Sequence, residues 1–158
     1  MFNRYAQDPV VTRYLSWTPH ADIEESRAIV ERMIRSWDTG EAFVWGVHGP
    51  SADAAAADGL IGTVGLESTP HGLELGYVLA RNRWGEGLMT EAASPVVEWA
   101  RARPDRFRVG AYCHVDNLAS ARVLEKVGLH HEARLCRWAT FPNVSPEPQD
   151  VLVYAWTR

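Results

Sequence analysis

One segment constrains the fold more than any other: a strand-forming run leads through a glycine-bearing turn into an amphipathic helix. The run extends from Glu74 to Leu79, the turn carries Gly85 and Gly87, and the helix is predicted over residues 88–103. The first turn of a helix presents backbone N–H groups without intrahelical acceptors, together with the positive end of the helix dipole. The segment therefore predicts an α/β chain with a site for a phosphate or pyrophosphate at this turn.

Helices and strands alternate along the rest of the chain. A helix capped by Asp22 and ended by Gly40 has an apolar stripe predicted to face the core, formed by Ile23, Val30, Met33, Ile34 and Trp37. A shorter helix, capped by Asp116 or Asn117, is predicted to run through Val127, and Ser51 to Asp58 is interpreted as a surface loop. Strands are predicted over 43–48, 60–67, 73–79, 106–115, 129–140 and 150–156.

This order predicts one domain over residues 1–158: a single mixed, mostly antiparallel α/β sheet with helices on both faces. A chain of 158 residues can bury a full core without disulfides. Its net charge of -4 argues against nucleic acid as a partner. No apolar run reaches the roughly 18 residues of a membrane span, and the N-terminus lacks the apolar core of a signal peptide. A cytoplasmic protein is predicted.

The cysteines and histidines do not form a metal motif. Cys113 and Cys136 lie in apolar segments without a CxxC pair, which predicts reduced, buried thiols, and His130-His131 lacks a second ligand pair. We therefore expect no metal.

Two nucleotide motifs are excluded at the glycine turn. No lysine follows Gly87, as a Walker loop requires, and Thr90 occupies the third glycine position of the dinucleotide fingerprint. Taken alone, the turn also fits ordinary tight packing of a helix against a strand.

Two motifs, in the same order as in the family, resemble the GNAT acetyltransferase superfamily. The first is Arg-Trp-Gly-Glu-Gly-Leu-Met-Thr-Glu-Ala from Arg83 to Ala92, after Gly-Tyr-Val-Leu; the second runs from Asn117 through Ser120 to Leu129. Within the superfamily, the Trp-Gly-x-Gly-x-x-Thr-Glu-Ala and Asn-x-x-Ser patterns are similar to those of ribosomal-protein N-terminal acetyltransferases. The resemblance covers nearly the whole chain.

The resemblance implies acetyl-CoA as co-substrate. Backbone groups of Val78 and Leu79 would pair with the pantetheine arm and polarise the thioester carbonyl. Asn117 and Ser120 would face the thioester. The pyrophosphate would be held by a turn composed of Arg83, Trp84, Gly85, Glu86, Gly87, Leu88, Met89 and Thr90.

Direct attack of an amine on a thioester requires a neutral amine, a polarised carbonyl and a proton for the departing thiolate. Glu74 is the first candidate for the base and His114 the second, while Ser120 is the candidate acid. Many relatives carry a tyrosine four residues after the serine position, where this chain has Leu124.

Each assignment has a structural alternative. Glu74 fits an exposed strand position, Ser120 a packing role, and Asn117 a helix cap. At the level of function, the alternative to an N-acetyltransferase is a non-catalytic domain that binds or senses acyl-CoA.

The acceptor is predicted to be a primary amine, either a protein N-terminus or a small molecule. Acidic residues near the N-terminus favour a cationic amine: Asp22, Glu24, Glu25 and Glu41. The N-terminal helices are expected to form one wall of its cleft, opposite the loop from Pro142 to Pro148. Tryptophans that could line it are Trp17, Trp138 and Trp156, whereas Trp37, Trp45 and Trp99 are assigned to the core.

Relatives usually begin with a strand, whereas this sequence begins almost at the helix that follows it; we expect either that this strand is missing or that the fold does without it. The neighbouring strand would then have an open edge, and we expect another chain to cover it, as in a homodimer.

Overall fold

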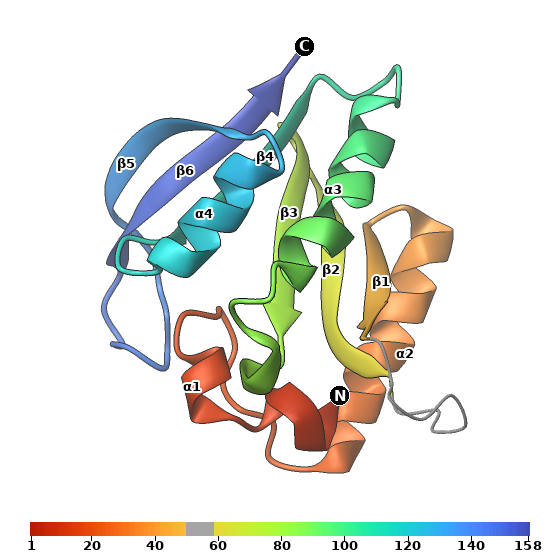
Figure 1. The fold of residues 1–158 in the computed structure, drawn as a ribbon, viewed down its shortest axis with the longest axis vertical. Coiled ribbons are helices and arrows are strands. Elements are labelled where there is room, and N and C mark those ends of the chain that lie inside the picture. Colours follow the sequence, from red (N-terminus) through yellow and green to blue (C-terminus); the bar gives the residue numbers. More distant parts are fainter. Residues whose placement is uncertain (50–58) are drawn as a thin grey trace.

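A six-stranded sheet with helices on both faces forms the fold of the computed structural model, which describes residues 1–49 and 59–158 (Figure 1). The loop predicted from Ser51 to Asp58 lies outside the described residues. The strands are β1 (Ala42–His48), β2 (Leu60–Thr69), β3 (Gly72–Leu79), β4 (Arg108–His114), β5 (His130–Ala139) and β6 (Gln149–Thr157). The helices are η1 (Phe2–Ala6), α1 (Pro9–Thr12), α2 (Ile23–Thr39), η2 (Arg81–Arg83), α3 (Leu88–Arg101) and α4 (Leu118–Lys126).

The sheet order is β1-β2-β3-β4-β6-β5, and every neighbouring pair is antiparallel except β3 and β4. This confirms the mixed, mostly antiparallel sheet. Trp45 and Phe43 of β1 contact Trp99 of α3, whereas Val44 lines a cavity with Met33 of α2. Because alternate residues of a strand point to opposite faces, α2 and α3 cover opposite faces of the sheet.

The central core lies between β3, β4 and the helices α3 and α4. Along β4, the apolar residues Val109, Ala111 and Cys113 are buried, as their alternation predicts. Cys136 is exposed, so the prediction of a second buried thiol is wrong. It lies on β5, the outermost strand, where much of the strand faces solvent.

The apolar stripe of α2 is less buried than predicted. Ile34 is 63% exposed and Ile23 49%, while the buried positions of the helix are Ser26 and Ser36. The reason is that α2 packs on β1, the edge strand, so the sheet beneath it covers only one side of the stripe.

Trp37 of α2 folds around the open edge of β1. Its Nε1 donates a hydrogen bond to the Val44 carbonyl at 3.1 Å, and its ring packs edge-on against Phe43 and Trp45. The protein's own helix therefore covers part of the edge that was expected to require another chain.

Within residues 1–49 and 59–158, no helix combines the length and apolarity needed to cross a bilayer.

Candidate active site

The neighbouring strands β3 and β4 separate from each other at the centre of the sheet. They pair only through Leu73 with Val109 and Glu74 with Gly110, and beyond these pairs the two strands diverge (Figure 1). The gap opens into a cavity of about 1130 Å³ that both strands line, together with the N-terminal segment and the first turns of α3 and α4. The cavity therefore lies beside backbone groups of β3 that have no strand partner on this side.

The register of β2 and β3 determines which backbone groups of β3 face the gap. The Val78 carbonyl lies against Gly62 of β2, and the Ala80 N–H bonds the Ile61 carbonyl. In an antiparallel strand, the N–H and C=O groups of successive residues point alternately to the two neighbouring strands. The N–H and C=O groups of Tyr77 and Leu79 therefore point toward the gap. Of the two predicted residues, Leu79 faces the gap and Val78 faces β2, while Tyr77 supplies the other gap-facing peptide group.

The glycine turn brings the start of α3 to one end of this cavity. Gly85 and Gly87 have φ angles of 83° and 79°, which favour glycine, and no atom lies within 4 Å of where a Cβ would project. Gly87 is the N-cap, so no side chain caps the first N–H groups of α3. The turn thus offers both open space and free donors, as an anion site requires. The predicted residues Trp84, Leu88, Met89 and Thr90 also line the cavity.

Arg83 is engaged by a neighbouring acid. Its guanidinium donates to both carboxylate oxygens of Glu86 at 2.9–3.2 Å. The pair neutralises the one cationic side chain of the turn, so the backbone N–H groups remain the principal donors.

We expect Glu86→Gln to strengthen binding of acetyl-CoA, because it releases the Arg83 guanidinium for the phosphates. An exposed ion pair contributes about 0.2–1 kcal/mol, so the dissociation constant should fall up to about 5-fold at low salt and less at high salt. Titration calorimetry would measure the dissociation constant at both salt concentrations. Glu98→Gln is the matched control, because Glu98 pairs with Arg101 at the other end of α3. Equal affinities of both variants and the parent at low salt would contradict the assignment.

The start of α4 contributes Asn117 and Ser120 to the cavity wall. Asn117 is the N-cap, its side-chain oxygen accepting from the Ser120 N–H at 3.2 Å, which agrees with the cap interpretation. The Ser120 hydroxyl lies 2.8 Å from the phenolic oxygen of Tyr77. Leu124, one turn further along, is buried.

Glu74 lines the cavity from β3, directly opposite Glu67 of β2. Burial raises the pKa of the Glu74 carboxyl, and the negative charge of Glu67 raises it further. The two carboxylates also raise the pKa of Tyr112, in addition to the larger effect of burial. This wall of the cavity is therefore acidic, and Glu74 takes up a proton more readily than an exposed glutamate.

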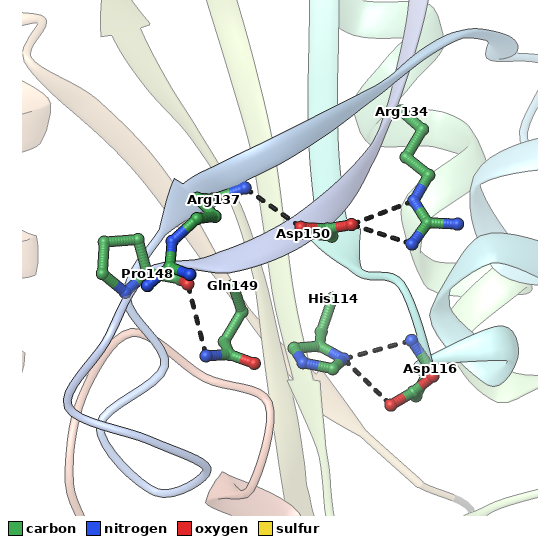
Figure 2. A network of polar contacts seen from close by, with 7 residues as sticks. All are labelled: His114, Asp116, Arg134, Arg137, Pro148, Gln149 and Asp150. Carbon is green, nitrogen blue, oxygen red and sulfur yellow. Dashed lines mark hydrogen bonds and ion pairs between the residues drawn. The ribbon is translucent and has the colours of Figure 1, made fainter.

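His114 lies apart from these groups. Its ring stacks on Tyr14 at 4.7 Å, packs edge-on against Phe141 at 5.1 Å, and is not part of the cavity wall. Figure 2 shows the Nδ1 contact with Asp116, whose backbone N–H donates to Nδ1 at 3.1 Å. In the neutral ring the proton then resides on Nε2, which is buried and has no partner in the described part of the chain. His114 thus packs against Tyr14 and Phe141, two side chains that line the cavity.

Residues far apart in sequence form the remaining wall of the cavity. Tyr14, Trp17 and Phe141 line it. The Asn143 side-chain amide donates to the Thr12 carbonyl at 2.7 Å and to the Trp17 carbonyl at 2.8 Å. The loop after β5 is therefore fastened to the N-terminal segment, and the two form one wall instead of facing each other across the cleft.

Trp138 and Trp156 do not line the cavity. Trp138 is 62% exposed on β5, and Trp156 packs against the core with the Arg101 guanidinium over its ring. Trp45 and Trp99 pack against the core, as predicted.

Among the described residues, no three His, Cys, Asp or Glu side chains are grouped as metal ligands would be.

Sequence reasoning missed Glu67 and Tyr77 as members of the site. Glu67 would have followed from pairing the two predicted strands of the hairpin in register. Tyr77 could be found only by knowing which strand peptides face the gap and where α4 begins.

The comparisons with known proteins agree with this geometry. Residues 1–130 match the acetyltransferase (GNAT) domain family. The N-acetyltransferase YoaA of Bacillus subtilis is 28% identical over 141 residues, covering 89% of this chain and 78% of YoaA. Two solved structures share the fold: the acetyltransferase from Salmonella typhimurium that modifies the N-terminal serine of ribosomal protein L7/L12, and the spermidine N-acetyltransferase of Vibrio cholerae with CoA and spermine. Their TM-scores are 0.79 and 0.74, at 20% and 15% identity. They align with 97% of this chain, and the alignments cover 84% and 85% of their own chains.

A splayed sheet, an uncapped helix start after a glycine turn and a family match over most of the chain define an acyl-transferring enzyme. The chain belongs to the GNAT acetyltransferase family.

Proposed function

We propose that the enzyme transfers the acetyl group directly to a primary amine in a ternary complex, with Glu74 as the base and Ser120 as the acid. One observation carries the proposal: the carboxylate and the hydroxyl line the same cavity, where the gap between β3 and β4 leaves backbone groups of β3 without a strand partner. The thioester would lie in that gap, with the pyrophosphate at the turn before α3.

In this reaction the amine nitrogen forms a bond to the acetyl carbonyl carbon, and the carbon–sulfur bond breaks with its electron pair on sulfur. Glu74 accepts the proton that nitrogen loses. Ser120 supplies a proton to the sulfur and regains one from Glu74 through water as the products leave. A peptide N–H of Tyr77 or Leu79 is placed to stabilise the charge that develops on the carbonyl oxygen.

A covalent acetyl-cysteine intermediate is disfavoured at this site. Cys113 lines the cavity, but burial raises the pKa of its thiol to about 11, with Ser120 lowering it only partly. A protonated thiol is a poor nucleophile, so direct attack by the amine is the simpler route. Lines that intersect in a two-substrate kinetic analysis would agree with this route.

The acceptor class proposed is a cationic primary amine, either a protein α-amine or a small molecule. The acidic wall formed by Glu67 and Glu74 supports it, because that wall would attract a protonated amine, which releases one proton to solvent before the neutral amine attacks and gives its next proton to Glu74. Structural neighbours act on each kind of acceptor, as their names state.

We further propose a cytoplasmic location, no nucleic-acid partner, and a homodimer as one way to cover the rest of the β1 edge.

The proposal is tested by measuring thiol release from acetyl-CoA with N-terminal peptides, polyamines and aminoglycosides. We expect at least one class to be acetylated, and Ser120→Ala to lower kcat about 100-fold while leaving acetyl-CoA affinity unchanged. If acetyl-CoA binds but no amine in the panel is acetylated, the sensing-domain alternative replaces the proposal.

A further inference from the structure

Tyr77 and Ser120 form a pair that connects the central strand to the first turn of α4. The phenolic oxygen of Tyr77 lies 2.8 Å from Ser120 Oγ and 3.0 Å from the Ser120 carbonyl oxygen. Both residues are half-buried and line the cavity. The phenol therefore contacts both oxygens of the residue that the proposed function assigns as the acid.

A phenol carries one proton, so it can satisfy only one of these two oxygens at a time. If that proton goes to the carbonyl, the phenolic oxygen accepts from the serine, and the serine proton points at Tyr77. If it goes to Oγ, the serine proton is free to point elsewhere. The Ser120 carbonyl lies within α4, where the N–H four residues later can serve as its donor. In the second arrangement both oxygens of Ser120 therefore have a donor.

We propose that Tyr77 is a positioning residue, whose phenol donates to Ser120 Oγ and thereby directs the serine hydroxyl proton toward the departing sulfur of coenzyme A. The inference rests on the proposed function. No bond to Tyr77 is made or broken, and its proton stays on the phenolic oxygen throughout. What Tyr77 supplies is the orientation of a hydroxyl that would otherwise rotate freely.

The surroundings of the pair fit this role. Burial raises the pKa of the Tyr77 phenol, the hydrogen bond to Ser120 opposing the shift only in part, so the phenol stays protonated throughout the working pH range. The two buried residues of α4, Ala121 and Leu124, are apolar and cannot replace the donor. The contact of Ser120 with Cys113 lowers the pKa of the thiol, so there the hydroxyl donates to Sγ, and a thiol sulfur is only a weak acceptor that competes little for the serine proton.

Tyr77→Phe removes only the phenolic oxygen and keeps the ring that packs against the core. We expect kcat to fall about 10-fold, a part of the roughly 100-fold that the acid supplies, with unchanged KM for acetyl-CoA and for the amine. In Ser120→Ala, the second change should have no further effect, so the double variant should match Ser120→Ala alone. A purely structural role would instead give losses that multiply.

Tyr154→Phe is the matched control, because Tyr154 is also buried and donates its phenolic proton to Glu125 outside the cavity. Its kcat should equal that of the parent enzyme. The inference is overturned if Tyr77→Phe keeps full kcat, if it raises KM for acetyl-CoA instead, if both tyrosine variants lose kcat equally, or if the losses multiply in the double variant. If Ser120→Ala itself keeps full kcat, the acid assignment in the proposed function fails first.

Discussion

Glu74→Gln should reduce kcat by about 100-fold or more while leaving acetyl-CoA affinity unchanged, because the amide cannot accept the proton of the attacking amine. It should also raise the melting temperature at neutral pH. The folded-state pKa of Glu74 is raised, so the ionised carboxylate costs stability above that pKa, and protonation removes the cost as pH falls through it. The stability gain of the variant should therefore shrink as the pH is lowered. Steady-state thiol release and thermal melts at several pH values would measure both effects.

Glu67→Gln is the matched control for this prediction. It removes the facing negative charge but keeps the base, so the pKa of Glu74 should fall and the acid limb of the kcat profile should move to lower pH. Two results would argue against Glu74 as the base. One is a loss of kcat in Glu67→Gln as large as that in Glu74→Gln, and the other is full kcat in Glu74→Gln.

Gly87→Val should abolish the thermal stabilisation that acetyl-CoA gives the parent enzyme. At 100 times its dissociation constant, a ligand that binds only the folded state adds about 2.7 kcal/mol, or roughly 5–11 °C for a domain of this size. A side chain at Gly87 would project into the open space in front of the uncapped N–H groups of α3. A melt with and without acetyl-CoA measures the difference.

Gly40→Val separates the loss of binding from backbone strain. Gly40 ends α2 with a φ of 70°, has no atom within 4 Å of a Cβ position, and does not line the cavity. Both valines therefore adopt an unfavourable left-handed conformation and should lower the melting temperature of the free protein similarly. Only Gly87→Val should lose the acetyl-CoA shift, and a shift retained there would remove the turn from the cofactor site.

The order of elements could be predicted from sequence because each depends on local signals: alternation along β4, the caps at Asp22 and Asn117, and glycines that end helices. The apolar stripe of α2 could not be placed, because periodicity identifies an apolar face without telling how much sheet lies beneath it. Four of the five stripe residues stay exposed: Ile23, Val30, Ile34 and Trp37.

The site could be predicted as a set of segments but not as a set of contacts. Glu74 and Ser120, which line the cavity, could be proposed from sequence because their motifs are local. The stacking of His114 on Tyr14 and the bond from Tyr77 to Ser120 join residues that are distant in the chain, and their geometry depends on where β3 and β4 diverge. No single-residue pattern encodes that point of divergence.

The short pairing of β3 with β4 also determines how firmly the two halves of the sheet are joined. Strands β1 to β3 form one half of the sheet and β4 to β6 the other. The two halves pair only through Leu73 and Glu74 of β3. Beside these pairs, Gly72 lies so close to the Arg108 carbonyl that a Cβ would not fit. Strand pairing therefore joins the two halves of the sheet at one end only. A pantetheine arm bonded to the free edge of β3 would stiffen the other end, so the substrate itself would complete the rigidity of the enzyme that acts on it.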